Sequence, residues 1–529
     1  MIDGEMQAYD LTIDKFLTHA AKWRPDAEVV TARGGGEIQR IGYADLKARA
    51  VRTSAVLQSL DARAGDRIAT LAWNTQEHVE AWYAVMGMGA VCHTLNPRLT
   101  EAQLADMVGQ SQARIVIASA DLAPLARRIA ARAPSLQRIL TIGGEPGAVA
   151  AKGPGPTPQA LEPMLATAHD DVVWGGFPET TPSGLCFTSG TTGAPKGVTY
   201  THRSSFLHTL RQLQADVMAL SASDRVLAAV PMFHANAWGL PFAAPASGAR
   251  LVLPGRDLDG ASLARLINTE GVTVAVGIAT VWLGLVEHME KTGVETPTLR
   301  RVVVGGAPLA PALMERIEQR LGATVQTSWG MTELSPLGAC APPDDPGRSA
   351  LSSGRAAFGV DLLLTDADGR ALPDQRAGEG HLRARGPSVV QRYFGHAENA
   401  TDADGWFATG DLARINEAGE LIITGRAKDL IKSGGEWINP AEIEAIVNEH
   451  PDVSLAAVIG RADPKWGERP ILVIQARDAS VSDEGIIAPL RDRVAPWWIP
   501  DAIVRVDQMP LASTGKIDKM RLRTDYGDA

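Results

Sequence analysis

The chain has 529 residues, of which 45% are hydrophobic and 21% charged; this ordinary globular composition excludes a disordered or collagen-like chain. At ~150 residues per domain, the length predicts roughly three or four structural units. The 51 basic and 61 acidic side chains give a net charge of −10, which argues against a general binder of nucleic acids or anionic membranes.

Short β-branched runs alternate with amphipathic stretches from residue 66 onward. Residues 66–73 and 90–95 favour strands, and the stretch 75–89 between them favours a helix. A second helix is expected to begin after Thr100, and the apolar run 113–119 favours another strand. The alternation returns further on, with strands at 271–278, 299–306 and 323–330 and a helix at 310–321. This order predicts α/β layers around mostly parallel sheets.

The alternation of strands and helices is interrupted at two places along the chain. Residues 146–183 are rich in Gly, Pro, Ala and Thr, and we expect them to form a surface connection. Between residues 358 and 393, an Asp-Gly turn separates short alternating runs, which favours antiparallel β-structure. The alternation restarts after Gly425 over about a hundred residues, which is enough for a small α+β domain.

The cysteines and the first residues bear on the cellular compartment. Three cysteines lie far apart in the sequence, at Cys92, Cys186 and Cys340. They form no CxxC pair, so we expect buried reduced thiols and neither a disulfide framework nor a zinc site. The acidic start MIDGEMQAYDL lacks the apolar core of a signal peptide, and prolines interrupt the least polar stretch, 237–253. We therefore expect a cytoplasmic protein without a transmembrane segment.

A segment rich in glycine and hydroxyl side chains follows the apolar run 184–187. Its sequence is Thr188-Ser189-Gly190-Thr191-Thr192-Gly193-Ala194-Pro195-Lys196-Gly197. Glycines let backbone N–H groups approach phosphate oxygens, hydroxyls donate hydrogen bonds, and the lysine supplies a mobile charge. The spacing differs from the GxxxxGK[ST] of P-loop NTPases. The segment predicts a phosphate-binding loop of another type.

This loop resembles the phosphate loop of the adenylate-forming superfamily, which contains acyl-CoA synthetases, adenylation domains of peptide synthetases and firefly-type luciferases. Five further segments resemble motifs of that family and occur in its order: GGAP at 305–308, SWGMTE at 328–333, GWFATGD at 405–411, GRAKD at 425–429 and STGK at 513–516. The resemblance covers nearly the whole chain. It implies an α/β protein whose large N-terminal domain combines layered α/β subdomains with a β-rich segment, followed by a small mobile α+β domain. The implied ranges are 1–425 for the large domain, 426–430 for a hinge and 431–529 for the small domain.

The resemblance implies a reaction in two steps. A carboxylate and MgATP first give an acyl-adenylate and pyrophosphate, and a thiol then attacks the adenylate to give a thioester and AMP. The implied cofactors are ATP, Mg²⁺ and, as co-substrate, CoA. Because both reactants of the first step are anionic, the site must hold them together and neutralise charge at the phosphates.

The resemblance also assigns roles to catalytic residues. Lys516 would bridge the attacking carboxylate and the α-phosphate. Thr332 would contact phosphate, and Glu333 would bind Mg²⁺, which prefers a carboxylate together with substrate phosphates. His234, in PMFHANAW, matches an aromatic gate residue at the mouth of the acyl pocket.

The nucleotide contacts follow from the same motifs. Asp411 would accept both ribose hydroxyls, and Arg426 would make a second ribose or phosphate contact. Trp329, where relatives commonly carry Tyr or Phe, would stack on adenine. The full predicted ATP- and AMP-binding set is Thr188, Ser189, Gly190, Thr191, Thr192, Lys196, Gly306, Ala307, Pro308, Ser328, Trp329, Gly330, Met331, Asp411 and Arg426.

The acyl pocket is expected around a large aromatic ring. Trp238 would project into the tunnel, which favours short or medium acyl chains, including thioether acids such as methylmercaptopropionate. Long-chain fatty acids and arylpropenoic acids stay open. The predicted walls are His234, Trp238, Val276, Gly277, Gly306, Gly330, Met331 and Pro336.

The acceptor is expected to be free CoA. No Asp lies between Pro231 and Gly239 to hold an amino-acid substrate, and no carrier domain follows Lys516. Lys428 matches the family's hinge residue. The predicted CoA contacts are Lys432, Ser433, Gly434, Gly435, Glu436 and Trp437.

Three other classes of function share parts of this pattern. They are a luciferase-like oxygenase, an acyl-adenylate ligase that loads carrier proteins, and a binding-only pseudoenzyme. The presence of Lys516 and Glu333 argues against the last. The expected partners are a small carboxylic acid, ATP and CoA, with no nucleic acid, and a homodimer is a candidate assembly.

Overall fold

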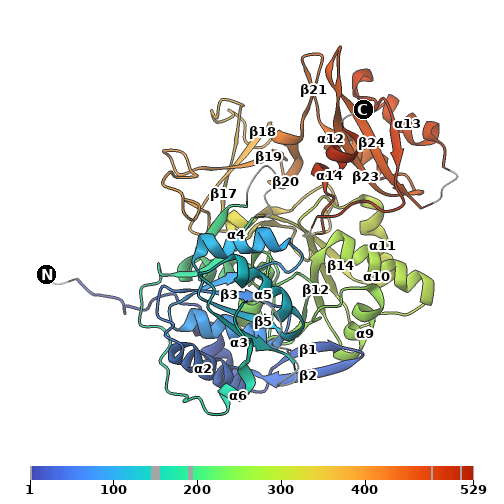
Figure 1. Cartoon of the computed structure of the whole chain (residues 1–529). Helices are drawn as coiled ribbons and strands as arrows, with labels where there is room; N and C mark the ends of the chain where they lie inside the picture. The colour runs from blue at the N-terminus through green and yellow to red at the C-terminus, as the bar shows by residue number, and fades with distance from the viewer. Residues whose placement is uncertain (1–2, 145–154, 189–194, 478–480, 513–514, 528–529) are drawn as a thin grey trace.

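The structure is a computed structural model that describes residues 3–144, 155–188, 195–477, 481–512 and 515–527 (Figure 1). Most of the chain forms a large α/β body, and the C-terminal residues form a smaller lobe above it in this view. Three sheets belong to the large body and one to the small lobe. The N-terminal helix α1 (Asp14–Trp23) packs against the large body.

The first α/β layer is built on a seven-stranded sheet with the order β7-β6-β5-β3-β4-β8-β9. All its pairs are parallel except β8–β9. Its central strands are buried apolar runs, as expected where helices cover both faces of a parallel sheet. The strands are β3 (Arg67–Leu71), β4 (Val91–Thr94), β5 (Ile115–Ser119), β6 (Arg138–Ile142), β7 (Gln159–Ala160), β8 (Pro182–Phe187) and β9 (Gly197–Thr201). The helices are α2 (Tyr43–Ser59), α3 (Gln76–Gly87), α4 (Glu101–Ser111), α5 (Ala123–Arg132) and α6 (Leu161–Leu165).

The second layer is built on a nine-stranded sheet with the order β16-β15-β14-β13-β12-β10-β11-β1-β2. Its middle strands, from β1 to β14, are parallel, so the loops that follow β12, β13 and β14 meet at one edge. The strands are β1 (Glu28–Gly34), β2 (Glu37–Gly42), β10 (Arg225–Ala228), β11 (Arg250–Leu253), β12 (Val274–Ile278), β13 (Arg301–Gly305), β14 (Thr324–Gly330), β15 (Leu337–Cys340) and β16 (Arg355–Ala356). The helices are α7 (His202–Gln212), α8 (Leu240–Ser247), α9 (Gly260–Glu270), α10 (Ala279–Thr292) and α11 (Pro311–Leu321).

Two antiparallel arrangements follow. A four-stranded sheet has the order β17-β18-β19-β20, and the small lobe has the order β22-β21-β24-β23, with β25 pairing with β24. The strands are β17 (Asp361–Thr365), β18 (Glu379–Arg385), β19 (Phe407–Ile415), β20 (Leu421–Arg426), β21 (Ile431–Ser433), β22 (Glu436–Ile438), β23 (Val453–Asp463), β24 (Gly467–Ala476) and β25 (Ile503–Arg505). The helices of the small lobe are α12 (Pro440–Val447), α13 (Asp483–Arg491) and α14 (Lys519–Tyr526).

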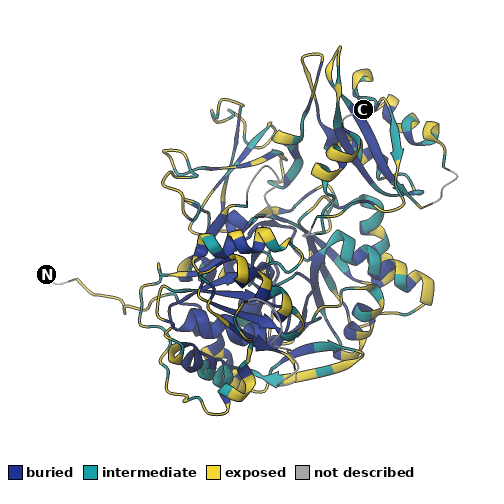
Figure 2. Ribbon diagram, viewed as in Figure 1, coloured by how far each residue is buried: buried dark blue, intermediate teal, exposed yellow. Residues whose placement is uncertain are grey.

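The predicted fold class is confirmed: a mixed α/β protein with a large N-terminal and a smaller C-terminal domain. The strands at the centre of the large body are mostly buried, and exposed residues lie along the outer helices and loops (Figure 2). All three cysteines are free and buried, as expected. Within the described ranges, no helix is long and apolar enough to cross a membrane.

Candidate active site

A lysine from the small domain reaches the edge of the large domain where β12 and β13 end. A Cβ placed on Gly306 would lie 3.6 Å from Cε of Lys516. The Thr280 hydroxyl, at the start of α10, donates a hydrogen bond of 3.3 Å to the carbonyl oxygen of Gly515. Since Gly306 directly follows β13, the lysine lies at the carboxyl edge of the parallel sheet, where α/β proteins commonly place their ligands.

The charges around Lys516 come from distant parts of the sequence. Burial and the positive charge of Arg426 lower the pKa of Lys516 to about 8, while the carboxylates of Asp411 and Glu333 act in the opposite direction. Four of the predicted site residues therefore lie close enough to interact electrostatically. An ammonium with a pKa this low loses its proton within reach of physiological pH.

Asp411 is a buried carboxylate with a partner on each oxygen. Asp411 on β19 lies opposite Arg426 on β20 in the antiparallel register, and its Oδ1 lies 2.6 Å from Nε of the arginine. Its Oδ2 accepts a hydrogen bond of 2.9 Å from Nε1 of Trp329. Burial raises the pKa of Asp411, and the charge of Arg426 opposes this. The carboxylate is thus fixed in orientation, as an acceptor for two neighbouring hydroxyls requires.

Trp329 packs inside the protein beside that carboxylate. Its ring is 8% exposed and belongs to the core under β17–β20. A Cβ on Gly338 of the neighbouring strand would come within 2.4 Å of the ring, so only glycine allows this approach. The adenine-stacking role of Trp329 stays a prediction, whereas its indole N–H has a defined partner in Asp411.

Glu333 is buried in the short turn Thr332–Leu334 that follows β14. The Tyr393 hydroxyl donates a hydrogen bond of 2.9 Å to its Oε1, and burial raises the pKa of the carboxyl. The described ranges hold no group of three or more His, Cys, Asp or Glu side chains that could bind a metal ion. One carboxylate fits Mg²⁺ that arrives with phosphates, since that ion is held by one or two carboxylates and substrate oxygens.

The ends of the predicted phosphate loop are closed by hydrogen bonds. The Thr188 N–H donates to the carbonyl oxygen of Lys196 at 2.9 Å, and the Lys196 N–H donates to Oγ1 of Thr188 at 3.2 Å. These bonds continue the antiparallel pairing of β8 with β9. The predicted contacts Ser189, Gly190, Thr191 and Thr192 lie outside the described residues. Ala307 and Pro308, predicted for the same nucleotide, are exposed after β13.

The predicted acyl pocket contains a turn of left-handed backbone. Residues 235–238 have φ values of 43°, 53°, 47° and 51°, and Gly239 has 79°. This turn brings the Trp238 ring to 3.0 Å from a Cβ placed on Gly305 and 3.7 Å from one on Gly306. The Gln212 amide donates a hydrogen bond to the carbonyl oxygen of Trp238. The ring therefore lies against the same glycine loop as Lys516.

The remaining predicted pocket residues line the same edge. Burial and the charge of Lys516 lower the pKa of His234 to about 4, so the imidazole is neutral at pH 7. Val276 is fully buried in the core cluster that contains Trp238. Gly277 lies in β12, Gly330 ends β14, Met331 follows it, and Pro336 directly precedes β15. Ser328, which was predicted to contact the nucleotide, also lies in β14.

The predicted CoA contacts lie elsewhere. Residues 432–437 form the β21–β22 hairpin of the small domain, which Figure 1 shows at the top, away from the large domain. Ser433 is buried, and the other five are exposed. The Lys432 ammonium lies 5.4 Å from the Trp437 ring centroid. The structure thus brings Lys516, but not the residues predicted to contact CoA, to the site. Lys428, the predicted hinge residue, is exposed in the short turn between β20 and β21.

Comparisons with known proteins identify the family. The AMP-binding enzyme model matches residues 17–394, and the model of the AMP-binding enzyme C-terminal domain matches residues 442–516. The chain belongs to the AMP-binding enzyme family. It is 39% identical to the 3-methylmercaptopropionyl-CoA ligase of Ruegeria lacuscaerulensis, with 99% of each chain covered. It is also 39% identical to the medium-chain-fatty-acid–CoA ligase of Ectopseudomonas oleovorans, covering 99% of this chain and 98% of the relative.

Solved structures agree with this assignment. ATP-bound MatB from Rhodopseudomonas palustris has a TM-score of 0.85 at 26% identity, covering 98% of this chain and 99% of that one. A fatty acyl CoA synthetase of Mycobacterium tuberculosis has a TM-score of 0.74 at 28% identity, with 98% of each chain covered.

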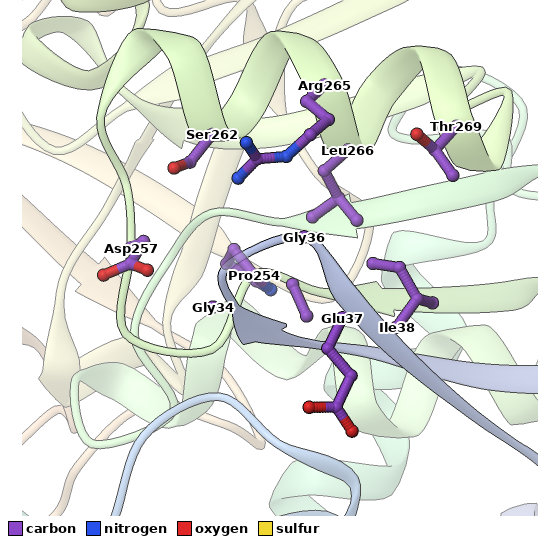
Figure 3. Close-up of a pocket in the computed structure, with 11 residues that line it drawn as sticks. Gly34, Gly36, Glu37, Ile38, Pro254, Asp257, Ser262, Arg265, Leu266 and Thr269 are labelled. Atoms are coloured by element: carbon purple, nitrogen blue, oxygen red, sulfur yellow. The ribbon is translucent and has the colours of Figure 1, made fainter.

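This AMP-binding enzyme has a separate hollow between the β1–β2 hairpin and α9 (Figure 3). Glu37 on the hairpin, Asp257 in the loop before α9 and Arg265 on the helix contribute charged side chains to its lining. None of the predicted site residues lines it.

Three contacts at the main site were not anticipated: those of Tyr393, Thr280 and Gln212.

Proposed function

We propose that this AMP-binding enzyme is an ATP-dependent acid–thiol ligase. It converts a carboxylate, ATP and CoA into an acyl-CoA, AMP and pyrophosphate through an acyl-adenylate. The observation that carries the proposal is the placement of Lys516 against Gly306, near the charged groups that the nucleotide motifs supply. The CoA-ligase names of the relatives support the same reaction.

In the first half-reaction, Lys516 holds the two anionic reactants together. Its ammonium binds the attacking carboxylate and an α-phosphate oxygen at once, which lowers their repulsion and orients the attack. Asp411 fixes the ribose, and Arg426 holds that carboxylate in place. Magnesium, when bound with ATP, would offset phosphate charge, and Glu333 is the residue that would hold it. The neutral His234 adds no charge of its own at the proposed mouth of the acyl pocket.

The second half-reaction requires another arrangement of the domains. The residues proposed to contact CoA, at 432–437, lie in the β21–β22 hairpin at the top of the small lobe, away from the large domain (Figure 1). We place the hinge at 426–430, with Lys428 as its pivot, between domains at 1–425 and 431–529. Rotation there would withdraw Lys516 and bring the hairpin to the adenylate.

The acid is proposed to be a short- or medium-chain fatty acid or a methylthio-alkanoic acid. The Trp238 ring lies against Gly305, and its bulk there supports a limit on the length of the acyl chain. The relatives named for methylmercaptopropionate and for medium-chain fatty acids are consistent with this class. The co-substrates ATP and CoA fit a cytoplasmic enzyme, and a homodimer stays a candidate assembly.

The proposal is tested with a panel of acids in the presence of ATP, Mg²⁺ and CoA. AMP release and thioester mass should appear with short, medium and methylthio acids, and should fall for long-chain and arylpropenoic acids. Adenylate without thioester would instead indicate a ligase that loads carrier proteins. Light output or oxygen uptake would indicate an oxygenase.

A further inference from the structure

The loop between β18 and β19 connects two parts of the proposed nucleotide site. The Val390 N–H donates a hydrogen bond of 2.7 Å to the carbonyl oxygen of Glu333, and the Phe394 N–H donates one of 2.8 Å to the carbonyl oxygen of Gly197. The loop is therefore tied by its backbone to the acidic turn after β14 and to the end of the phosphate loop. These two parts are far apart in the sequence.

Tyr393 lies between these two anchors and contacts a charged side chain at each. Its hydroxyl donates a 2.9 Å hydrogen bond to Oε1 of Glu333. The Lys196 ammonium lies 4.8 Å from the centroid of its ring, within the range of a cation–π contact. The ring is half-buried beside the core under β17–β20. Packing against this core fixes the position from which the phenol donates to Glu333.

We propose that Tyr393 is a positioning residue that holds the carboxylate of Glu333, the proposed Mg²⁺ ligand, and the ammonium of Lys196 in fixed positions relative to each other. The inference rests on the proposed function, in which Glu333 binds Mg²⁺ with ATP. The hydrogen bond from the phenol to Oε1 restrains the orientation of the carboxylate, and Oε2 would then be the oxygen offered to the cation. Hydrogen bonds of this kind to a metal ligand commonly change metal affinity by roughly 10–100-fold when removed.

The ring has a second, separable effect. A lysine side chain has several rotatable bonds, so an ammonium held over an aromatic face spends more of its time in one place. Lys196 is exposed, and the Tyr393 ring is the aromatic face that it contacts. Removal of the Tyr393 hydroxyl should therefore raise the Mg²⁺ concentration that ATP binding requires. Removal of the whole ring should also weaken the binding of phosphate by Lys196.

Calorimetric titration of the full-length protein with ATP over a series of Mg²⁺ concentrations separates the two effects. Tyr393→Phe should raise the Mg²⁺ concentration for half-maximal ATP affinity roughly tenfold. Its affinity for AMP in EDTA should stay as in the wild type. Tyr393→Leu should show the same shift and, at saturating Mg²⁺, a further loss of ATP affinity of roughly two- to fivefold.

Tyr200→Phe is the matched control. Tyr200 is a buried tyrosine whose hydroxyl donates a 2.8 Å hydrogen bond to the backbone carbonyl of Thr332, one residue from Glu333. This variant should lower the melting temperature without moving the Mg²⁺ dependence. A double-mutant cycle with Glu333→Gln tests the contact itself, because Tyr393→Phe should have no further effect on Mg²⁺ dependence in that background.

The outcomes distinguish the inference from the proposed function. A wild-type Mg²⁺ dependence in Tyr393→Phe, or an equal shift in Tyr200→Phe, would overturn the positioning role and leave Tyr393 as a packing residue. If the wild-type protein itself binds ATP with no response to Mg²⁺, the proposed function fails at the metal step instead.

Discussion

Raising the pH should slow adenylate formation, because Lys516 loses its proton. Burial and Arg426 lower its pKa to about 8. The active form is the ammonium, so activity is full below this pKa and is lost as the pH rises through it. Above pH 8, each further pH unit should lower kcat/KM for ATP in this step roughly tenfold, since kcat/KM reports the free enzyme. The inflection in kcat should lie higher, because bound triphosphate favours the charged lysine.

The assay measures the two half-reactions separately. Pyrophosphate release without CoA reports adenylate formation, and thioester formation from a prepared acyl-adenylate and CoA reports the second step. The second step should rise with pH over the same range, because the thiolate is the nucleophile. Lys516→Arg keeps its charge at every pH tested, so its lower rate of adenylate formation should show no fall between pH 8 and 10.

Two results would refute this reasoning. A flat kcat/KM for adenylate formation between pH 7 and 10 would mean that no group with a pKa of about 8 acts in the free enzyme. A fall that persists unchanged in Lys516→Arg would assign the titration to another residue.

Three substitutions test the remaining assignments. Lys516→Ala should lower adenylate formation by roughly 10²–10³-fold but leave thioester formation from prepared adenylate nearly intact; equal losses in both steps would contradict the bridging role. Asp411→Ala should chiefly raise the KM for ATP, by about tenfold, since its proposed contacts are to ribose and not to the reacting atoms; an unchanged ATP dependence would rule this out. Trp238→Ala should move the longest acid accepted toward longer chains and lower kcat/KM for the shortest acids, at ~0.8 kcal/mol or roughly fourfold per CH₂ of lost contact. If the chain-length profiles of the wild type and the variant are parallel after correction for the folded fraction, Trp238 is only a core residue.

Much of the scaffold follows from local patterns in the sequence. Thr100 caps α4 in a reciprocal arrangement with Gln103, which the order of residue types after Thr100 suggests directly. The motif glycines Gly305 and Gly306 come directly at the end of a predicted strand, and the structure places them at the edge of the sheet where Lys516 arrives. Because the ends of parallel strands lie at the same edge of a sheet, the position of these glycines can be predicted without knowing how the side chains pack.

Other features depend on contacts that no local pattern encodes. Tyr393 and Glu333 are 60 positions apart, and their hydrogen bond exists because a loop returns across the site. The placement of Lys516 depends on how two domains pack. The indole N–H of Trp329 donates to Asp411 because Gly338 leaves room for the ring, and a stacking role cannot be inferred from residue type alone.

The left-handed turn at 235–239 has a consequence for attempts to redesign the acyl specificity. Four consecutive non-glycine residues there hold positive φ angles, each at a cost of roughly 1–2 kcal/mol for L-residues. In a library randomised at position 238, the backbone conformation therefore disfavours some side chains whichever acid is tested. Val, Ile and Thr suit such angles poorly, whereas Gly, Asn and Asp tolerate them. Variants with an enlarged pocket should be enriched in residues that tolerate positive φ angles. A broader substrate range and a more flexible backbone would then evolve together at this position.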